Sequence, residues 1–375
     1  MIPRAAALAA LVAVGGCNAP LRIGVVVPES GVAAVYGASV KSGVKLAFDR
    51  ALAAGTAPHG LEVVYRDSGS DPARAVSAAE GLFENGAVAV IGGVTSAEAK
   101  ALIPVADRAA CVLLSPSASA PDLARRTRFF FRVYPSDELE GVKAADFLVL
   151  TRGTRTVLVL QEDNDYTRGL LPVFVAELAS RGGRITGSVR LDEGGWQAQV
   201  RETIGPHTPD GVYVCGYGEA ILGALRLLRN LGFRGTICTT SAFSAASLLA
   251  RAGSLAEGVF FPLVSLDVTS HQESVRSFVT RYKAIYNLLP DIYAAHGYDA
   301  ALTLLASLDG LREPSGVALA KRLHALSGIS GVMGPIAFDE DGNVQRALTN
   351  HWIRGGRVED FDSFGEKAHS AGGSE

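Results

Sequence analysis

Short apolar runs alternate with stretches of helical periodicity along this chain, and this alternation restricts the fold more than any other feature. The clearest runs in the first part of the chain occupy residues 21–28, 61–67, 87–91 and 112–114. Helices are expected between them at residues 37–54, 71–86 and 96–108. Strands separated by helices form a parallel sheet with helices on both faces. The first part of the chain is therefore predicted to form an α/β unit.

The same pattern begins again after Phe129-Phe130-Phe131. Further strands are expected at residues 156–161, 185–191, 211–215, 236–239, 258–262 and 351–353. The accompanying helices are expected at residues 138–150, 170–181, 197–204, 219–231, 274–286 and 293–308. A length of 375 residues suits about two domains. The chain is therefore predicted to contain two α/β units.

Two segments rich in small residues directly follow apolar runs. The run 112–114 ends at Ser115-Pro116 and continues as Ser117-Ala118-Ser119-Ala120-Pro121. Proline cannot donate to a strand ladder, so Pro116 ends the strand. Gly92-Gly93-Val94-Thr95-Ser96 has the same form one strand earlier. Because ligands bind beyond such strand ends in open α/β sheets, the two segments are predicted to hold a small anion such as a carboxylate. Taken alone, each composition is first a signal for an ordinary loop.

The N-terminus has the features of an export signal. Arg4 precedes an apolar run at residues 5–14 that is too short to span a bilayer. Val14-Gly15-Gly16-Cys17 resembles a bacterial lipobox, with Val14 where leucine is usual. We therefore expect residues 1–17 to form a lipoprotein signal peptide, with Cys17 carrying a lipid that anchors the exported protein to the membrane. A plain secretory signal cleaved nearby is the alternative.

Composition and motifs argue against several other functions. The net charge of −3 gives no electrostatic case for nucleic-acid binding. Cys111, Cys215 and Cys238 lack metal-binding spacing; the last two end successive strands, and buried free thiols are the expected state. The chain has neither a Gly-x-Ser-x-Gly elbow nor a His-Glu-x-x-His motif. Gly216-Tyr217-Gly218 only partly matches a dinucleotide fingerprint, because Ile221 replaces its third glycine. We expect no cofactor, no metal and no enzymatic activity.

Several short motifs, in their order and spacing, resemble the leucine/isoleucine/valine-binding proteins, which are extracytoplasmic solute receptors of ABC importers. They are Ile23-Gly24-Val25, Pro28-x-Ser30-Gly31, Tyr36-Gly37, Asp67 with Asp71-Pro72, Ser115-Pro116 with Ala120-Pro121, Gly297-Tyr298-Asp299-Ala300, and Met333-Gly334-Pro335 with Phe338-Asp339 and Gly342. The resemblance implies two doubly wound Rossmann-like lobes joined by a three-stranded hinge, the type I periplasmic binding protein fold. Lobe 1 would comprise residues 21–136 and 266–347, and lobe 2 residues 137–265 and 348–362. Residues 363–375 are expected to form a disordered tail.

The resemblance also implies a ligand site in the cleft between the lobes, which close over it by bending at the hinge. Ser96 matches a serine that binds the ligand carboxylate, and Ser117, Ala118 and Ser119 match a loop that grips the carboxylate and the amino group. The aromatic residues carried over are Tyr36 and Tyr293 as walls, with Tyr166 and Tyr217 reaching across from the second lobe.

The chain departs from the family pattern at two points. A disulfide would join the positions of Ser70 and Thr95, so it is absent. The acid that neutralises the ligand's ammonium would fall at Ser241, and Glu219 is the nearest replacement by sequence. Because a buried ammonium without a partner costs several kcal/mol, we expect zwitterionic leucine to bind poorly. A keto acid, an aromatic acid or an amide is then a credible ligand.

The resemblance implies an importer component whose partners are a small-molecule ligand, ABC permease subunits and, through the lipid anchor, the membrane. Two alternatives stay open. One is a ligand-sensing receptor module of the same fold. The other is an exported α/β enzyme, which turnover of a ligand would reveal.

Overall fold

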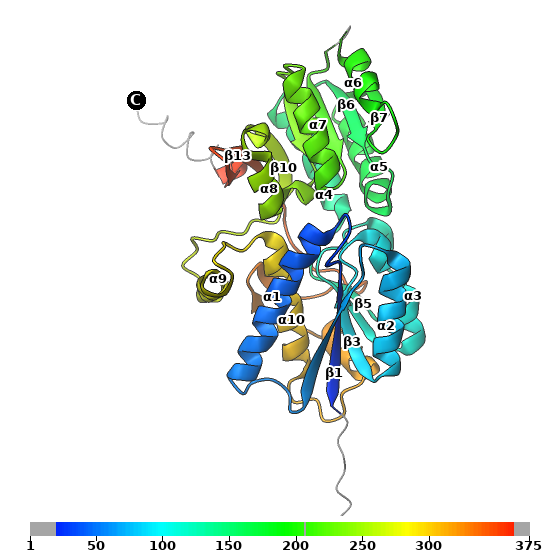
Figure 1. Ribbon diagram of the computed structural model, residues 1–375, viewed down its shortest axis with the longest axis vertical. Helices are drawn as coiled ribbons and strands as arrows, with labels where there is room; N and C mark the ends of the chain where they lie inside the picture. The colour runs from blue at the N-terminus through cyan, green and yellow to red at the C-terminus, as the bar shows by residue number, and fades with distance from the viewer. Residues whose placement is uncertain (1–19, 206–207, 364–375) are drawn as a thin grey trace, which may run out of the picture.

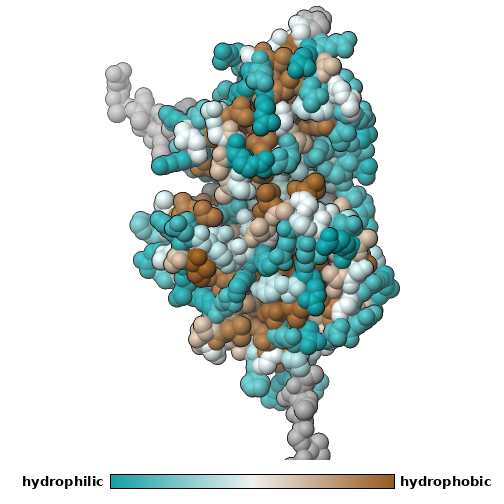
Figure 2. Space-filling model, viewed as in Figure 1, coloured by the Kyte–Doolittle hydropathy of each residue, from teal (hydrophilic) through white to brown (hydrophobic). Residues whose placement is uncertain are grey.

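Two β-sheets organise the chain, one at the centre of each of two lobes that lie end to end along the long axis of the molecule (Figure 1). The computed structural model describes residues 20–205 and 208–363. The predicted signal peptide with Cys17, and the tail beyond Ser363, lie outside these residues. Figure 2 shows the surface pinched inward between the two lobes. The predicted α/β class with two lobes is confirmed.

The first sheet is entirely parallel, with the strand order β2-β1-β3-β4-β5. Its strands are β1 (Leu21–Val27), β2 (Leu61–Asp67), β3 (Ala87–Gly92), β4 (Val112–Ser115) and β5 (Phe130–Arg132). Alternate residues of β1 point to opposite faces: Val25 belongs to the core shared with the helix α1 (Ala34–Ala53), and Val26 to the core under α2 (Pro72–Glu84) and α3 (Ser96–Ala109). Burial on both faces explains why the inner strands β1, β3 and β4 are apolar.

The second sheet has the order β14-β13-β10-β9-β8-β6-β7, and only β13 and β14 break its parallel pattern. Its strands are β6 (Thr156–Gln161), β7 (Arg184–Arg190), β8 (Gly211–Cys215), β9 (Thr236–Thr239), β10 (Val259–Leu263), β13 (Thr349–Arg354) and β14 (Arg357–Asp360). The helices of this lobe are α4 (Asp137–Asp146), α5 (Asp165–Ser180), α6 (Trp196–Ile204), α7 (Gly218–Asn230) and α8 (Ala246–Ala252).

The chain passes between the two sheets three times. It leaves the first sheet after β5, returns after β10 and leaves again before β13. Between the second and third crossings it forms α9 (Glu273–Tyr286), α10 (Ile292–Leu308), α11 (Gly316–His324) and the hairpin of β11 (Ile329–Gly331) with β12 (Gly334–Ile336). The residue limits given above for each lobe stay a prediction.

Two expectations about individual elements were wrong. A helix was expected at residues 170–181, but α5 already begins at Asp165, because Asn164 and Thr167 form a capping box there. Residues 138–150 were expected to form one helix, but the α-helix ends at Asp146 and a π-turn follows over Phe147–Thr151. The pattern also missed β5, whose three residues are too few to show a period.

Glycine allows α1 and α10 to pack against each other at unusually short range. A Cβ atom on Gly43 would lie 1.8 Å from the carbonyl oxygen of Ala294, and one on Gly297 would lie 2.4 Å from that of Val40. The two helices therefore meet backbone to backbone at these positions. This contact explains the glycine of the Gly297-Tyr298-Asp299 motif, and it sets the position of Tyr36 and Tyr293 at the helix ends.

We expect Gly43→Ala to destabilise the protein by roughly 1–3 kcal/mol or more, because the added methyl group forces the two helices apart. Chemical denaturation measures this change. Gly81→Ala is the matched control, since a Cβ on Gly81 in α2 meets nothing within 4 Å. That control should be neutral or more stable by about 0.5–1 kcal/mol. Equal midpoints for Gly43→Ala and the wild type would contradict the packing argument.

Candidate functional site

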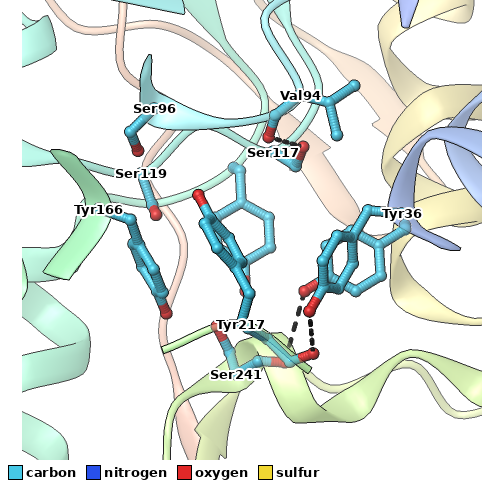
Figure 3. Close-up of a pocket in the computed structure, with 11 residues that line it drawn as sticks. Tyr36, Val94, Ser96, Ser117, Ser119, Tyr166, Tyr217 and Ser241 are labelled. Carbon is cyan, nitrogen blue, oxygen red and sulfur yellow. Dashed lines mark hydrogen bonds between the residues drawn. The ribbon is translucent and has the colours of Figure 1, made fainter. Parts of the chain in front are cut away.

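A small cavity lies between the lobes, beyond the carboxyl ends of strands from both sheets. It is lined by Tyr36, Val94, Ser96, Ser117, Ser119, Tyr134, Tyr166, Tyr217, Ser241, Ala242 and Tyr293. Figure 3 shows the serines of the first lobe on one side of this space and Ser241 on the other. The cavity measures about 20 Å³, and a single water needs about 10–15 Å³ on the same scale. The structure is therefore closed over a space for little more than one water.

Eight of the nine predicted ligand-binding residues line this cavity. They are Tyr36, Ser96, Ser117, Ser119, Tyr166, Tyr217, Ser241 and Tyr293. Ala118 does not: it is buried, and its amide donates to the hydroxyl of Ser115. Sequence reasoning did not include Val94, Tyr134 and Ala242, which complete the lining. The proximity of these residues is shown; their contact with a ligand stays a prediction.

The two strand-end segments of the first lobe are tied together by serine hydroxyls. Ser115 donates to the carbonyl of Gly93 at 2.8 Å, and Ser117 donates to the carbonyl of Val94 at 2.7 Å (Figure 3). Ser96 accepts from the amide of Ala120 at 3.3 Å. These bonds follow from the parallel pairing of β3 with β4, which brings both carboxyl ends to one edge of the sheet.

Several backbone amides at this edge donate no hydrogen bond to a protein group. Within the described residues, the amides of Ser96, Ser117 and Ser119 make no hydrogen bond. Ser96 is the first residue of α3, whose N-terminus is held by a capping box between Thr95 and Glu98. Helix N-termini attract anions through such free amides and the helix dipole. The edge is therefore suited to a small anion.

Four tyrosine rings form a continuous wall around the cavity. The ring centroids of Tyr36 and Tyr293 are 4.9 Å apart, those of Tyr36 and Tyr217 are 5.8 Å apart, and Tyr166 stacks on Tyr217 at 5.3 Å. The Tyr36 hydroxyl accepts from the amide of Gly218 at 2.9 Å and donates to the carbonyl of Ala242 at 3.1 Å. Burial raises the pKa of the Tyr36 hydroxyl, which therefore stays protonated.

Other contacts also bridge the lobes. Lys100 of α3 pairs with Asp165 of α5 at 2.9 Å, and Asp291 accepts from the amide of Ala246 at 3.3 Å. The Lys100–Asp165 pair is partly exposed, so it contributes at most about 1 kcal/mol. The two bonds of Tyr36 are buried, where solvent screens them less.

Glu219, the nearest candidate by sequence for a replacement acid, does not line the cavity. It is exposed on α7 and pairs with Arg251, whose charge and hydrogen bond lower the pKa of the Glu219 carboxyl. The carboxylate beside Ser241 belongs instead to Glu140 of α4. Its two oxygens accept from the amide and the hydroxyl of Ser241, both at 2.7 Å, and one also accepts from Tyr166 at 3.4 Å. An acid other than Glu219 therefore lies beside Ser241, which removes the reason for expecting weak leucine binding.

A second acid is buried close to Glu140. Asp137 is fully buried at the start of α4, and neither of its oxygens makes a hydrogen bond of standard geometry, although Ser119 and Arg132 lie near enough to favour its charge. Burial, and then the charge of Glu140, raise the pKa of Asp137 well above its usual value. Burial also raises the pKa of Glu140 to about 7.

Sequence reasoning missed Glu140 because acids in a first helical turn are ordinarily exposed and interact with the helix dipole. Its partner Ser241 lies 101 residues away, in another element. The signal that could have revealed it is the spacing Asp137-x-x-Glu140, because residues three apart share one face of a helix.

The remaining expectations about chemistry concern metals and thiols. The described residues hold no group of three or more His, Cys, Asp or Glu side chains that could bind a metal ion. Cys111, Cys215 and Cys238 are free thiols, and the last two are buried in neighbouring strands. In place of a disulfide, the Ser70 hydroxyl donates to the carbonyl of Ser30, and Thr95 caps α3.

Over residues 20–205 and 208–363, no helix is long and apolar enough to cross a membrane.

Comparison with known proteins decides the family. Residues 20–353 match the family model described as periplasmic binding protein. This chain belongs to the periplasmic binding protein family. The resemblance inferred from its motifs is confirmed.

Relatives and solved structures agree with this assignment. A Leu/Ile/Val-binding protein homologue from Brucella melitensis is 27% identical, over 87% of this chain and 89% of the relative. A leucine-binding protein structure from Thermotoga maritima has a TM-score of 0.84 at 26% identity, covering 91% of this chain and 97% of the other. The isoleucine complex of a branched-chain amino acid substrate-binding protein from Streptococcus pneumoniae has the same TM-score at 24% identity, covering 91% and 98%. By name, these relatives are binding proteins rather than enzymes.

We expect Tyr36→Phe to shift the ligand-free protein toward an open form, because the variant loses both interlobe bonds of the hydroxyl. Two hydrogen bonds at about 0.5–1.5 kcal/mol each correspond to a change of roughly 5- to 150-fold in the closed-to-open equilibrium. Small-angle X-ray scattering should show a larger radius of gyration. The control is Tyr286→Phe, which loses a bond to Ser42 within the first lobe. Equal radii for both variants would contradict the closure role.

Proposed function

We propose that the protein is the extracytoplasmic solute-binding component of an ABC-type importer and that its lobes close over a small ligand carrying a carboxylate. The family assignment supports the general role, because relatives that match most of the chain are named as Leu/Ile/Val-binding or leucine-binding proteins. The observation that carries the proposal is the interlobe cavity, which combines free amides on one side with tyrosine rings around it.

The ligand carboxylate is proposed to bind at the edge formed by Ser96, Ser117 and Ser119. No cationic side chain lines the described cavity, so amides and hydroxyls would carry the recognition of charge. Hydrogen bonds to a charged group contribute about 1.5–3 kcal/mol each. Two or three such bonds with aromatic burial are consistent with micromolar affinity, about 8 kcal/mol. Isoleucine, the ligand bound to the Streptococcus pneumoniae protein described above, also carries a carboxylate.

Binding is proposed to require opening of the cleft. A space of about 20 Å³ cannot admit an amino acid or an aromatic acid. The bonds of Tyr36 and Tyr293 across the cleft would therefore break to let the ligand in, and new contacts through the ligand would hold the closed form afterwards.

The importer role also requires a place outside the cytoplasm and a permease partner. We propose that the protein is exported and held at the membrane by a lipid on Cys17, with ABC permease subunits as its partners. Cys17 lies outside the described residues, so the sequence pattern alone supports the anchor. Metabolic labelling with a fatty-acid analogue, in the wild type and in Cys17→Ala, tests it.

The ligand class can be tested by a thermal-shift screen with amino acids, amides, keto acids and aromatic acids. A ligand of the folded state raises the melting temperature as its concentration exceeds the dissociation constant. We expect hits among carboxylates, confirmed by calorimetry. The absence of binding by any carboxylate would overturn the proposal.

We expect Ser96→Asp to weaken binding of the best carboxylate at least tenfold, because a second negative charge would face the ligand's own. Aspartate is well tolerated in the first turn of a helix, so the fold should survive. Ser77→Asp on the exposed face of α2 is the control, and it should bind as the wild type does. Calorimetric titration compares the three proteins; unchanged affinity in Ser96→Asp would place the carboxylate elsewhere.

A further inference from the structure

At Ser241 the cavity is lined by a neutral hydroxyl, and the carboxyl group of Glu140 lies directly behind that hydroxyl. Ser241 itself lines the cavity, and its hydroxyl donates to Glu140. A hydroxyl that donates in one direction still has lone pairs for a donor in the other. Ser241 can therefore accept a hydrogen bond from a ligand while Glu140 holds the hydroxyl in that orientation.

A second buried hydroxyl lines the cavity on this side. Tyr134 lines the cavity and is buried, and its hydroxyl makes no hydrogen bond of standard geometry within the described residues, although Ser241 lies near enough to oppose the rise that burial causes in the pKa of Tyr134. Burying a hydroxyl without a partner is unfavourable. A ligand group with several N–H donors could satisfy both Tyr134 and Ser241, which a second carboxylate could not do.

Two buried carboxyl groups near the cavity share one buried cation. Glu140 and Asp137 are both fully buried, and Arg132 is the one buried cation whose charge is felt at Asp137. The Arg132 guanidinium is already engaged by Asn343 at 2.7 Å and by the carbonyl of Ala120 at 3.0 Å. When both carboxyl groups are ionised, their two negative charges exceed the single positive charge of Arg132, so a cationic group in the cavity would favour that ionised state.

Resting on the function proposed above, we propose that Glu140 is a specificity-determining residue that acts through Ser241. Its carboxylate orients the Ser241 hydroxyl as an acceptor and supplies the charge opposite a ligand's ammonium group. The site then selects ligands that carry a cationic nitrogen near the carboxylate over the same acids without it. The ligand's carboxylate would lie at Ser96, Ser117 and Ser119, and its ammonium on the side of Ser241 and Tyr134.

The proposal implies a specific pH dependence. With no cation present, the pKa of Glu140 is about 7 because of burial. An ammonium group favours the ionised carboxylate, so affinity for an amino acid should rise as the pH rises through 7. Asp137 lies beside Glu140 on the same helix, and the titratable groups that face Glu140 from neighbouring elements are Tyr134, Tyr166, Tyr213, Cys215, Cys238 and Tyr293. Burial keeps the tyrosines and cysteines protonated, and Asp137 acts in the same direction as Glu140.

The test compares amino acids with the same acids lacking the amino group, by calorimetry on the full-length protein. The pairs are alanine and propionate, leucine and 4-methylpentanoate, and phenylalanine and 3-phenylpropionate. We expect the amino acid of the best-binding pair to bind at least tenfold more tightly in the wild type. In Glu140→Gln, its affinity should fall at least tenfold while that of the deaminated acid changes less than threefold.

Controls separate a charge effect from damage to the fold. Glu138→Gln alters an exposed acid on the same helix and should bind as the wild type does. If Glu140→Gln fails to fold, Ser241→Ala replaces it and should reduce the preference for the amino acid. In the wild type, affinity for the amino acid should rise at least fivefold between pH 5.5 and 8, and this rise should vanish in Glu140→Gln.

The outcomes are distinguishable. Equal losses for both members of a pair in Glu140→Gln, or tighter wild-type binding of the deaminated acid, would overturn the role of Glu140 but leave a carboxylate-binding function intact. A failure of all six acids, together with the other carboxylates of the screen, would overturn the proposed function as well.

Discussion

The parallel pairing of β3 with β4 is the constraint on which the site depends. It aligns two strand ends at one edge of the first sheet, where Ser115 and Ser117 tie the two following loops together. Those bonds use the serine hydroxyls and leave backbone amides free. The serines of this segment thus have two roles: some build the loop, and others face the cavity. Composition alone does not separate these roles, because hydroxyls of both kinds look alike in sequence.

The second lobe completes the site from elements distant in sequence. Tyr166 comes from the start of α5, Tyr217 from the start of α7, and Ser241 from the turn after β9. Each lies just beyond the carboxyl end of a strand of the second sheet. The two sheets thus present the same kind of edge to one another. Tyr36 joins them by bonding to both Gly218 and Ala242.

Several motifs that suggested the family have structural rather than ligand-binding roles. Asp299 is buried and accepts from the amides of Val332 and Met333 and from the side chain of Arg346. Burial raises the pKa of Asp299, and the Arg346 charge opposes that rise. Asp67 organises the loop after β2, accepting from the amides of Glu29 and Gly69. These contacts hold turns of the first lobe in place and require no ligand.

The amino-acid sequence by itself determined the alternation of strands and helices, the division into two α/β units and most of the residues around the cleft. Local rules suffice for the first two features, because hydrophobic period, proline and capping residues act within a few positions; the cleft residues followed from the order and spacing of motifs that resemble the family. Only the tertiary structure decided that Glu140, rather than Glu219, contacts Ser241, and that Tyr134 joins the cavity while Ala118 turns away from it. Those relations depend on how α4, α5 and the turn after β9 pack around the buried end of the second sheet. Contacts between residues about a hundred positions apart leave no local pattern, because burial and charge pairing are set by the packing of whole elements.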